Sequence, residues 1–394
     1  MRATRALIHL DAFRRNVQAV RSCIGETCRI CIPVKADAYG HGSLRIAGAG
    51  LEAGAYCLAV ASVQEGAELR AGGIKTPILL LSQAMPEELP EMVRSSLIPL
   101  LSDLEFAEEL AKIAVQLKAE VQVHLKVDTG MCRLGCRPKD AVSLAGAIAA
   151  MEGLVYAGTA THLSVADSPS PQDIEYTRTQ LECFRAVVES IRQAGIDPGI
   201  VHAANSGGVV FHPDSRFDMV RPGILLYGYS PKAAGHTGRA VCSIPVEPVM
   251  ELVSNIVFIK EVKKGESVSY GRIWTAAHDT TIGTIPVGYA DGFPRSLSGQ
   301  AHVVIRGEAH PIVGRICMDQ CLVDLGPGSQ VKRWEEVSVF GGPPPGLGAD
   351  VLAERTGTIS YEITCNINKR VERIYCEQGA KKMSVVRESC AVRH

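Results

Sequence analysis

The sequence predicts an α/β protein in which a (β/α)8 barrel is followed by a mainly antiparallel β domain. Two observations support this prediction. Between residues 29 and 227, short apolar runs alternate with helix-like segments, which is the pattern of parallel βαβ units. Beyond residue 250 the apolar runs are shorter and are separated by Gly- and Asp-containing turns, as in antiparallel sheets. The length of 394 residues also favours two domains over one.

Eight strand-like runs make up the predicted barrel. They lie at 29–35, 56–61, 77–82, 97–102, 121–128, 154–161, 200–203 and 219–227. Helix-like segments fill most gaps, at 44–53, 63–71, 86–94, 103–117, 138–151 and 172–194. Eight such units favour a closed TIM-type barrel. A doubly wound open sheet is the alternative on pattern alone, but no Gly-x-Gly-x-x-Gly follows the first strand.

The remaining elements define the domain limits. Residues 5–10 resemble a short strand, and Asp11 is a candidate N-cap for the helix that follows. The β domain is expected to contain strands at 250–259, 281–287, 302–305, 317–324 and 337–340, and then a helix that begins near Asp350. An unpatterned linker at 230–245 separates the two domains. We therefore predict a barrel at 11–235, a β domain at 236–376 that includes strand 1–10, and a tail at 377–394.

Composition narrows the class of protein. The net charge of −1, with both signs interleaved, predicts neither a nucleic-acid partner nor a membrane-surface partner. No stretch approaches the roughly 20 apolar residues that span a bilayer, and the amino terminus has no signal-peptide pattern, so we expect a cytoplasmic protein. The 13 cysteines are odd in number and spread along the whole chain. They are expected to be reduced thiols, with no disulfide and no metal site.

The segment Val34-Lys35-Ala36-Asp37-Ala38-Tyr39-Gly40-His41-Gly42 is the strongest candidate for a reactive site. Lys35 follows a buried strand at its carboxyl end, where α/β folds place their chemistry. In partly apolar surroundings the pKa of a lysine falls, and its free amine can then bond to a carbonyl carbon. An isolated lysine at a strand end is more often a solvated surface group. The neighbouring residues decide between these interpretations.

This segment closely resembles the pyridoxal-phosphate attachment motif of the alanine racemase family. Eight further motifs follow in the order of that family: 126–135, 161–163, 202–206, 221–224, 268–272, 288–292, 314–319 and 359–362. The resemblance extends from about residue 5 to residue 375. Nine motifs in register over two domains make a chance match implausible.

The resemblance implies an alanine racemase that uses pyridoxal 5′-phosphate and two bases to interconvert L- and D-alanine, supplying D-alanine for peptidoglycan synthesis. Removing the Cα proton from one face and returning it on the other requires a base on each face. By resemblance, Lys35 serves the D-enantiomer and Tyr270 the L-enantiomer. His162 and Arg133 are expected close enough to Tyr270 to favour its ionised form. Lys35 and Tyr270 fall in different predicted domains, and the resemblance implies a homodimer with shared active sites.

The resemblance also assigns the remaining site residues. The expected cofactor-binding residues are Lys35, Tyr39, His162, Asn205, Ser206, Arg221, Gly223, Ile224 and Tyr361. The expected substrate-binding residues are Arg133, Met318, Tyr289 and Cys317. Arg221 would face the pyridine nitrogen, and its charge would keep that nitrogen unprotonated and limit side reactions. Lys126 matches a lysine that some members carry as an N-carboxylated side chain that supports Arg133.

Other activities fit the same architecture. A serine or broad-specificity racemase of the same family is the nearest alternative, although Tyr361 is the choice typical of alanine racemases. An amino-acid decarboxylase is disfavoured by Arg221 and Tyr270, because decarboxylases usually place a glutamate at the cofactor nitrogen. A non-catalytic pyridoxal-phosphate carrier would lack the β domain. The departures from the family pattern are Cys132, where glycine is usual, and Leu163 and Val165 in the histidine motif.

Overall fold

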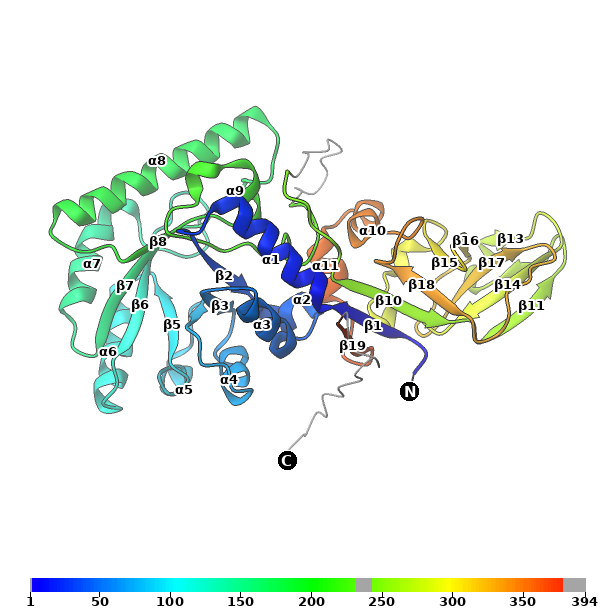
Figure 1. Cartoon of the computed structure of the whole chain (residues 1–394), viewed down its shortest axis with the longest axis horizontal. Coiled ribbons are helices and arrows are strands. Elements are labelled where there is room, and N and C mark those ends of the chain that lie inside the picture. Colours follow the sequence, from blue (N-terminus) through cyan, green and yellow to red (C-terminus); the bar gives the residue numbers. More distant parts are fainter. Residues whose placement is uncertain (1, 232–242, 378–394) are drawn as a thin grey trace.

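Two sheets organise the chain: a closed barrel of eight parallel strands and a nine-stranded sheet in the second half. The computed structural model describes residues 2–231 and 243–377. Figure 1 shows the barrel and its helices at one end of the molecule and most of the β domain at the other. The predicted (β/α)8 barrel followed by a mainly antiparallel β domain is therefore confirmed. Most of the predicted linker at 230–245, and all but the first residue of the tail at 377–394, lie outside the described residues.

Each of the eight predicted runs contains one barrel strand. The strands are β2 (Arg29–Pro33), β3 (Cys57–Val60), β4 (Ile78–Leu80), β5 (Leu97–Leu101), β6 (Val121–Lys126), β7 (Leu154–Ala160), β8 (Ile200–His202) and β9 (Met219–Val220). Pairing of β2 with β9 closes the barrel. The residues of β3, β4 and β5 are all buried, which explains why these strands read as continuous apolar runs without alternation.

The last predicted strand is wrong in length. Only Met219 and Val220 are in strand conformation, whereas the run was expected to continue to residue 227. Pro222 has no N–H to donate to a neighbouring strand. The chain then turns, because the N–H of Leu226 donates to Gly223 O (2.9 Å) and that of Tyr227 to Ile224 O (3.0 Å). Arg221 consequently lies just after a strand and not at the start of one.

Helices cover the outside of the barrel close to their predicted positions. They are α1 (Leu10–Ile24), α3 (Ser43–Glu52), α4 (Val63–Ala71), α5 (Leu89–Arg94), α6 (Leu104–Gln116), α7 (Ala141–Ala150) and α8 (Pro171–Gln193). Two short helices, α9 (Ser206–Phe211) and, in the second half of the chain, α11 (Ser360–Cys365), were not predicted.

The predicted N-cap of α1 is wrong, because the helix begins at Leu10 and His9 occupies the cap. Asp11 instead lies in the first turn and pairs with Arg14 (2.9 Å), where its charge favours the helix N-terminus.

The β domain has a nine-stranded sheet with the strand order β11-β14-β17-β16-β15-β18-β10-β1-β19, and a two-stranded sheet of β12 (Ser267–Val268) and β13 (Trp274–Thr275). The strands of the larger sheet are β1 (Arg5–His9), β10 (Met250–Asn255), β11 (Phe258–Val262), β14 (Thr280–Ile285), β15 (His302–Ile305), β16 (Glu308–Val313), β17 (Cys321–Gly326), β18 (Glu336–Phe340) and β19 (Glu372–Cys376). The helix α10 (Ala349–Thr356) begins one residue before the predicted Asp350. The amino-terminal strand β1 pairs with β10 and β19, so both ends of the described chain belong to this sheet.

Two predicted strands of this domain differ from the structure. The run 250–259 is divided between β10 and β11, because the N–H groups at the break bond to separate partners: Ile256 donates to Glu335 O and Val257 to Thr284 O. The run 317–324 becomes a strand only at Cys321. Cys317 and Met318 therefore lie in a loop.

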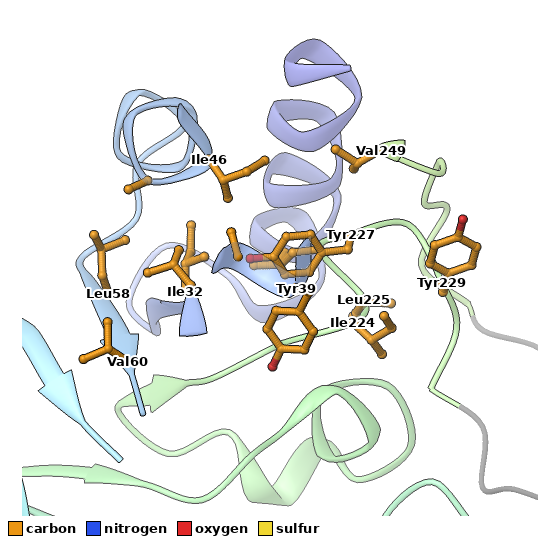
Figure 2. Close-up of a cluster of buried hydrophobic side chains, with 14 of the residues drawn as sticks. Ile32, Tyr39, Ile46, Leu58, Val60, Ile224, Leu225, Tyr227, Tyr229 and Val249 are labelled. Atoms are coloured by element: carbon orange, nitrogen blue, oxygen red, sulfur yellow. The ribbon is translucent and has the colours of Figure 1, made fainter. Parts of the chain in front are cut away.

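A buried cluster joins the barrel to the segment that leads into the β domain (Figure 2). Tyr227 is fully buried, and its hydroxyl donates to Pro33 O at the end of β2 (2.8 Å). Its ring lies 4.7 Å from that of Tyr39, measured between centroids. Asn16 on α1 donates to Leu226 O (3.0 Å) and Glu247 O (2.8 Å). The chain on both sides of the predicted linker is thus fixed against the same helix.

Candidate active site

A cavity of about 280 Å³ opens at the carboxyl ends of the barrel strands. Nine of the residues predicted for the site line it: Lys35, Tyr39, Arg133, His162, Asn205, Ser206, Arg221, Gly223 and Tyr361. Lys126 and Asp128, which end and follow β6, line it as well. The position of the cavity is the one at which barrel enzymes assemble their catalytic groups.

Lys35 enters this cavity from an unusual turn. Residues Ala36 to Tyr39 have φ values of 52° to 55°, so four consecutive residues without glycine adopt the left-handed conformation. Each such residue costs about 1–2 kcal/mol, and such strain persists only where the surroundings compensate for it. Glu65 Oε1 accepts from the Ala36 N–H (2.7 Å), and Asp37 Oδ1 accepts from the Ser43 N–H (2.8 Å). Burial, and next to it the charge of Arg133, lower the pKa of Lys35, which favours the neutral amine.

Tyrosine hydroxyl groups also line the cavity. The Tyr39 ring packs between Tyr227 and Tyr361, with its centroid 5.6 Å from that of Tyr361. Burial raises the pKa of both Tyr39 and Tyr361, so both hydroxyls stay protonated and can donate. A Cβ at Gly223 would lie 2.7 Å from the Tyr39 hydroxyl oxygen. The absence of a side chain at Gly223 therefore leaves room for this hydroxyl.

Ser206 and Asn205 hold the loop after β8. Ser206 Oγ accepts from the N–H of Gly223 (2.9 Å) and of Leu225 (3.3 Å), which joins this loop to the one after β9. Asn205 accepts from Gly208 N–H (2.9 Å) and donates to Leu163 O (3.1 Å). The side chain of Ile224 does not line the cavity and packs in the core cluster (Figure 2).

Arg221 is the most extensively bonded charge of the site. Its guanidinium donates to the carbonyl oxygens of Thr161 (2.8 Å) and Ala203 (3.1 Å), and to Nδ1 of His162 (3.2 Å). It also contacts Nδ1 of His202. Burial lowers the pKa of Arg221 to about 10, so the side chain is still protonated at neutral pH.

Two buried histidines extend this network, and sequence reasoning did not single them out as site residues. Nε2 of His202 lies 2.8 Å from Nδ1 of His124, which is on β6. Gly158 on β7 leaves the space for the His124 ring, because a Cβ there would lie 2.6 Å from it. One signal was available: His124 and Lys126 are two residues apart on one strand and so face the same side of the sheet.

The loop after β6 positions Arg133. Asp128 Oδ1 accepts from the N–H groups of Gly130 and Cys132, both at 3.0 Å. Cys132 has a φ of 55°, which explains why glycine is usual at this position in the resembled family. Lys126 is buried beneath this loop. Burial, and then the charges of Arg221 and Arg133, hold the pKa of Lys126 well below its ordinary value.

The other four predicted site residues lie on the β domain. Tyr270, Tyr289, Cys317 and Met318 do not line the barrel cavity. Tyr270 is 72% exposed and Met318 is 53% exposed, although both are large and partly apolar. The structure of one chain therefore presents the predicted site as two separate groups of residues.

Metal ligands, cysteines and membrane-spanning helices also bear on the class of protein. Within residues 2–231 and 243–377, no group of three or more His, Cys, Asp or Glu side chains could hold a metal ion. The cysteines of these residues are free thiols. No helix in this described part of the chain is long and apolar enough to cross a membrane.

Comparison with known proteins covers nearly the whole chain. Residues 8–231 match the family model described as alanine racemase, N-terminal domain, and residues 249–375 match alanine racemase, C-terminal domain. The alanine racemase of Treponema denticola is 48% identical over 382 residues, or 96% of this chain and 99% of that protein. That of Treponema pallidum is 44% identical and covers 95% of this chain and 100% of that protein.

Solved structures of alanine racemases have the same fold as this chain. The alanine racemase of Clostridium difficile 630 superposes with a TM-score of 0.89 at 36% identity, over 96% of this chain and 97% of that one. The alanine racemase of Bacillus anthracis with bound L-Ala-P gives 0.87 at 32% identity, over 96% of each chain. The fold and the order of its two domains define an amino-acid racemase, an isomerase. The chain belongs to the alanine racemase family, and its reaction is the interconversion of L- and D-alanine.

Proposed function

We propose that the enzyme uses pyridoxal 5′-phosphate, bound in the barrel cavity. Three parts of the cavity fit the three functional parts of this molecule. Lys35 supplies an amine for the aldehyde carbon, and its lowered pKa favours the neutral form. The hydroxyls of Tyr39, Ser206 and Tyr361, with the backbone at Gly223 and Ile224, supply donors for a phosphate. Arg221 supplies a permanent cation for the pyridine nitrogen, with Asn205 and His162 beside it.

The cofactor's chemistry when bound is to delocalise the charge left at Cα by proton removal. The protein's part is to move the proton. We propose that Lys35 Nζ takes or returns it on the face used by D-alanine and that the Tyr270 hydroxyl does so on the face used by L-alanine. Arg133 binds the substrate carboxylate, together with the backbone N–H of Met318. Tyr289 and Cys317 border the substrate.

We also propose that two subunits are needed for one site. The observation that supports this most directly is the exposure of Tyr270 and Met318 on the β domain, away from a cavity that already contains Lys35. Large exposed side chains of this kind are typical of surfaces that bury against a partner. A head-to-tail homodimer would bring the β domain of each subunit over the barrel of the other.

The remaining proposals concern context. We propose domain limits of 11–235 and 236–376, with residues 1–10 assigned to the β domain and 377–394 to a tail. We further propose a cytoplasmic location, where the enzyme would supply D-alanine for peptidoglycan synthesis. Pairing of β1 with β10 and β19 supports the assignment of the amino-terminal strand.

The test is formation of D-alanine from L-alanine by purified protein with pyridoxal phosphate, measured beside Lys35→Ala and Tyr270→Phe. Both variants are expected to lose most activity in both directions. Only Lys35→Ala should also lose the ultraviolet–visible absorption of covalently bound cofactor. A cofactor-loaded wild-type dimer that racemises serine faster than alanine would contradict the alanine preference. Full activity of Tyr270→Phe would contradict the two-base proposal.

A further inference from the structure

Two loops of the β domain carry Tyr289, Cys317 and Met318, and they lie backbone to backbone. The Tyr289 N–H donates to Cys317 O (3.1 Å), and the Ala290 N–H donates to Met318 O (3.0 Å). A Cβ on Gly288 would lie 2.3 Å from Cys317 O, so no side chain could fit between them. The loops at 288–292 and 314–319 are thus held together as one unit.

A buried carboxylate anchors this unit. The side chain of Asp291 is fully buried, and its Oδ2 accepts from the N–H of Gly288 and from Nη2 of Arg2, both at 2.9 Å. Its Oδ1 accepts from Arg370 Nε (2.7 Å). Burial favours the neutral acid, but the donated hydrogen bonds of Arg370, Arg2 and Gly288 outweigh it and lower the pKa of Asp291. Asp291 is therefore an ionised, fully paired anchor for Arg370.

Arg370 extends from this anchor to the surface. Its Nη2 donates to Asp319 Oδ1 (2.6 Å), and the Asp319 side chain is 57% exposed. The turn that carries Arg370 is also fixed, because the Asn368 N–H donates to Asp291 O (3.0 Å). One guanidinium group thus connects a buried anchor to the residue that follows Met318.

The backbone of Met318 is the element that this connection would orient. The turn 317–320 is closed by a hydrogen bond from the Cys317 N–H to Gln320 O (2.9 Å). Among residues 2–231 and 243–377, no acceptor lies against the Met318 N–H. A backbone donor left free at an exposed loop can bind an anion only if its peptide plane has a fixed direction.

We propose that Arg370, anchored on Asp291, is a positioning residue that acts through Asp319 to hold the Met318 N–H towards the carboxylate of the amino-acid substrate. This inference rests on the proposed role of Met318. The carboxylate is present in the substrate and throughout the reaction. Loss of the connection should therefore weaken binding in the ground state and the transition state alike, which raises KM and leaves kcat nearly unchanged.

The experiment compares Asp319→Ala with Asp319→Asn, in which the amide oxygen can still accept from Arg370. Asp279→Ala is the matched control, because Asp279 is an exposed carboxylate of the same domain that pairs with Lys263 (3.0 Å). Asp319→Ala should raise KM for both alanine enantiomers about tenfold, the factor that corresponds to about 1.4 kcal/mol of binding. Its kcat should stay within about threefold of wild type. Asp319→Asn should recover most of the loss, and Asp279→Ala should behave as wild type.

Binding of propionate, a carboxylate without an amine, gives a readout that does not depend on turnover. Calorimetry on the loaded dimer should show weaker propionate binding for Asp319→Ala than for Asp319→Asn. This comparison applies even if the wild type fails to racemise alanine, so the inference and the proposed function can fail separately. An unchanged KM and propionate affinity in Asp319→Ala would overturn the inference. So would equal losses in the two Asp319 variants, or dissociation of Asp319→Ala into monomers.

Discussion

The hydrogen bond of 2.8 Å between His202 Nε2 and His124 Nδ1 fixes the tautomers of two buried histidines. Arg221 can only donate hydrogen bonds, so the His202 Nδ1 that it contacts must be unprotonated. The proton of neutral His202 is then on Nε2, and it points to an unprotonated Nδ1 of His124. A chain of two neutral rings therefore leads from β6 to the cation of the site.

Acid should destabilise the enzyme through this chain. Burial, and then the charge of Arg221, lower the pKa of His124 from 6.5 to about 3. Between these two pH values the unfolded chain binds a proton that the folded chain does not. Stability therefore falls as the pH decreases below 6.5, by up to about 1.4 kcal/mol per pH unit for this one group.

His124→Asn should relieve this effect, because asparagine does not titrate and its oxygen can still accept from His202. At pH 5, unfolding of the variant in urea should take up about one proton fewer per chain than unfolding of the wild type, measured potentiometrically. Equal uptake by His124→Asn and wild type would show that His124 is already protonated in the folded enzyme.

Arg221 should govern reaction specificity through its charge. Arg221→Glu replaces a cation by a carboxylate that can keep a pyridine nitrogen protonated. Racemisation should therefore fall. Pyruvate, the product of transamination, should rise by at least tenfold per turnover, which corresponds to a change on the order of 1.4 kcal/mol in the relative activation free energies. Arg221→Lys keeps the charge and loses the hydrogen bonds that Nη2 donates to the carbonyl oxygens of Thr161 and Ala203. It should therefore lower the rate without raising pyruvate, as measured with a coupled lactate dehydrogenase assay. Equal pyruvate in the two variants would contradict a role for the charge.

The barrel and much of its cavity could be predicted because the relevant information is local. Strands buried on both faces leave continuous apolar runs, and Lys35 lies in a short motif at the end of such a run. Arg221 was recognised from its own motif, although the run that contains it was predicted too long. The left-handed turn at Ala36 to Tyr39 could not be predicted, because no glycine marks these four positions and the strain is compensated by Glu65, which is distant in sequence.

Contacts between residues that are distant in sequence also could not be predicted from local sequence patterns. His124 and His202 are 78 residues apart, and only barrel closure brings their rings together. The same limit applies to Asp291 and Arg370, whose ion pair joins two turns of the β domain. The end of β9 was misplaced because the apolar residues 224–227 continue the pattern of a strand, whereas Pro222 and the turn after it determine the backbone.

Lys126 should react with carbon dioxide. Its amine is buried and its pKa is held well below the ordinary value, which favours the neutral form whose free electron pair attacks CO2. The nitrogen forms a bond to the CO2 carbon and releases one proton to solvent. The resulting carbamate would be an anion near the cations of Arg133 and Arg221, which replaces a repulsion by an attraction. Enzyme incubated with 13C-bicarbonate should show a carbamate carbon signal by NMR, and Lys126→Met should not. Absence of the signal in a loaded wild-type enzyme would show that the neutral amine itself occupies the site.

The sharing of sites between subunits can be tested with heterodimers isolated by two different affinity tags. If Lys35 of one subunit works with Tyr270 of the other, a Lys35→Ala/Tyr270→Phe heterodimer contains one intact site and one site with both changes. It should show roughly half the wild-type activity, although each parent homodimer is nearly inactive. The matched control places both substitutions in one subunit and none in its partner. That heterodimer has one change in every shared site and should be inactive. The opposite pattern, with activity only when both changes lie in the same subunit, would place Lys35 and Tyr270 in one subunit's site.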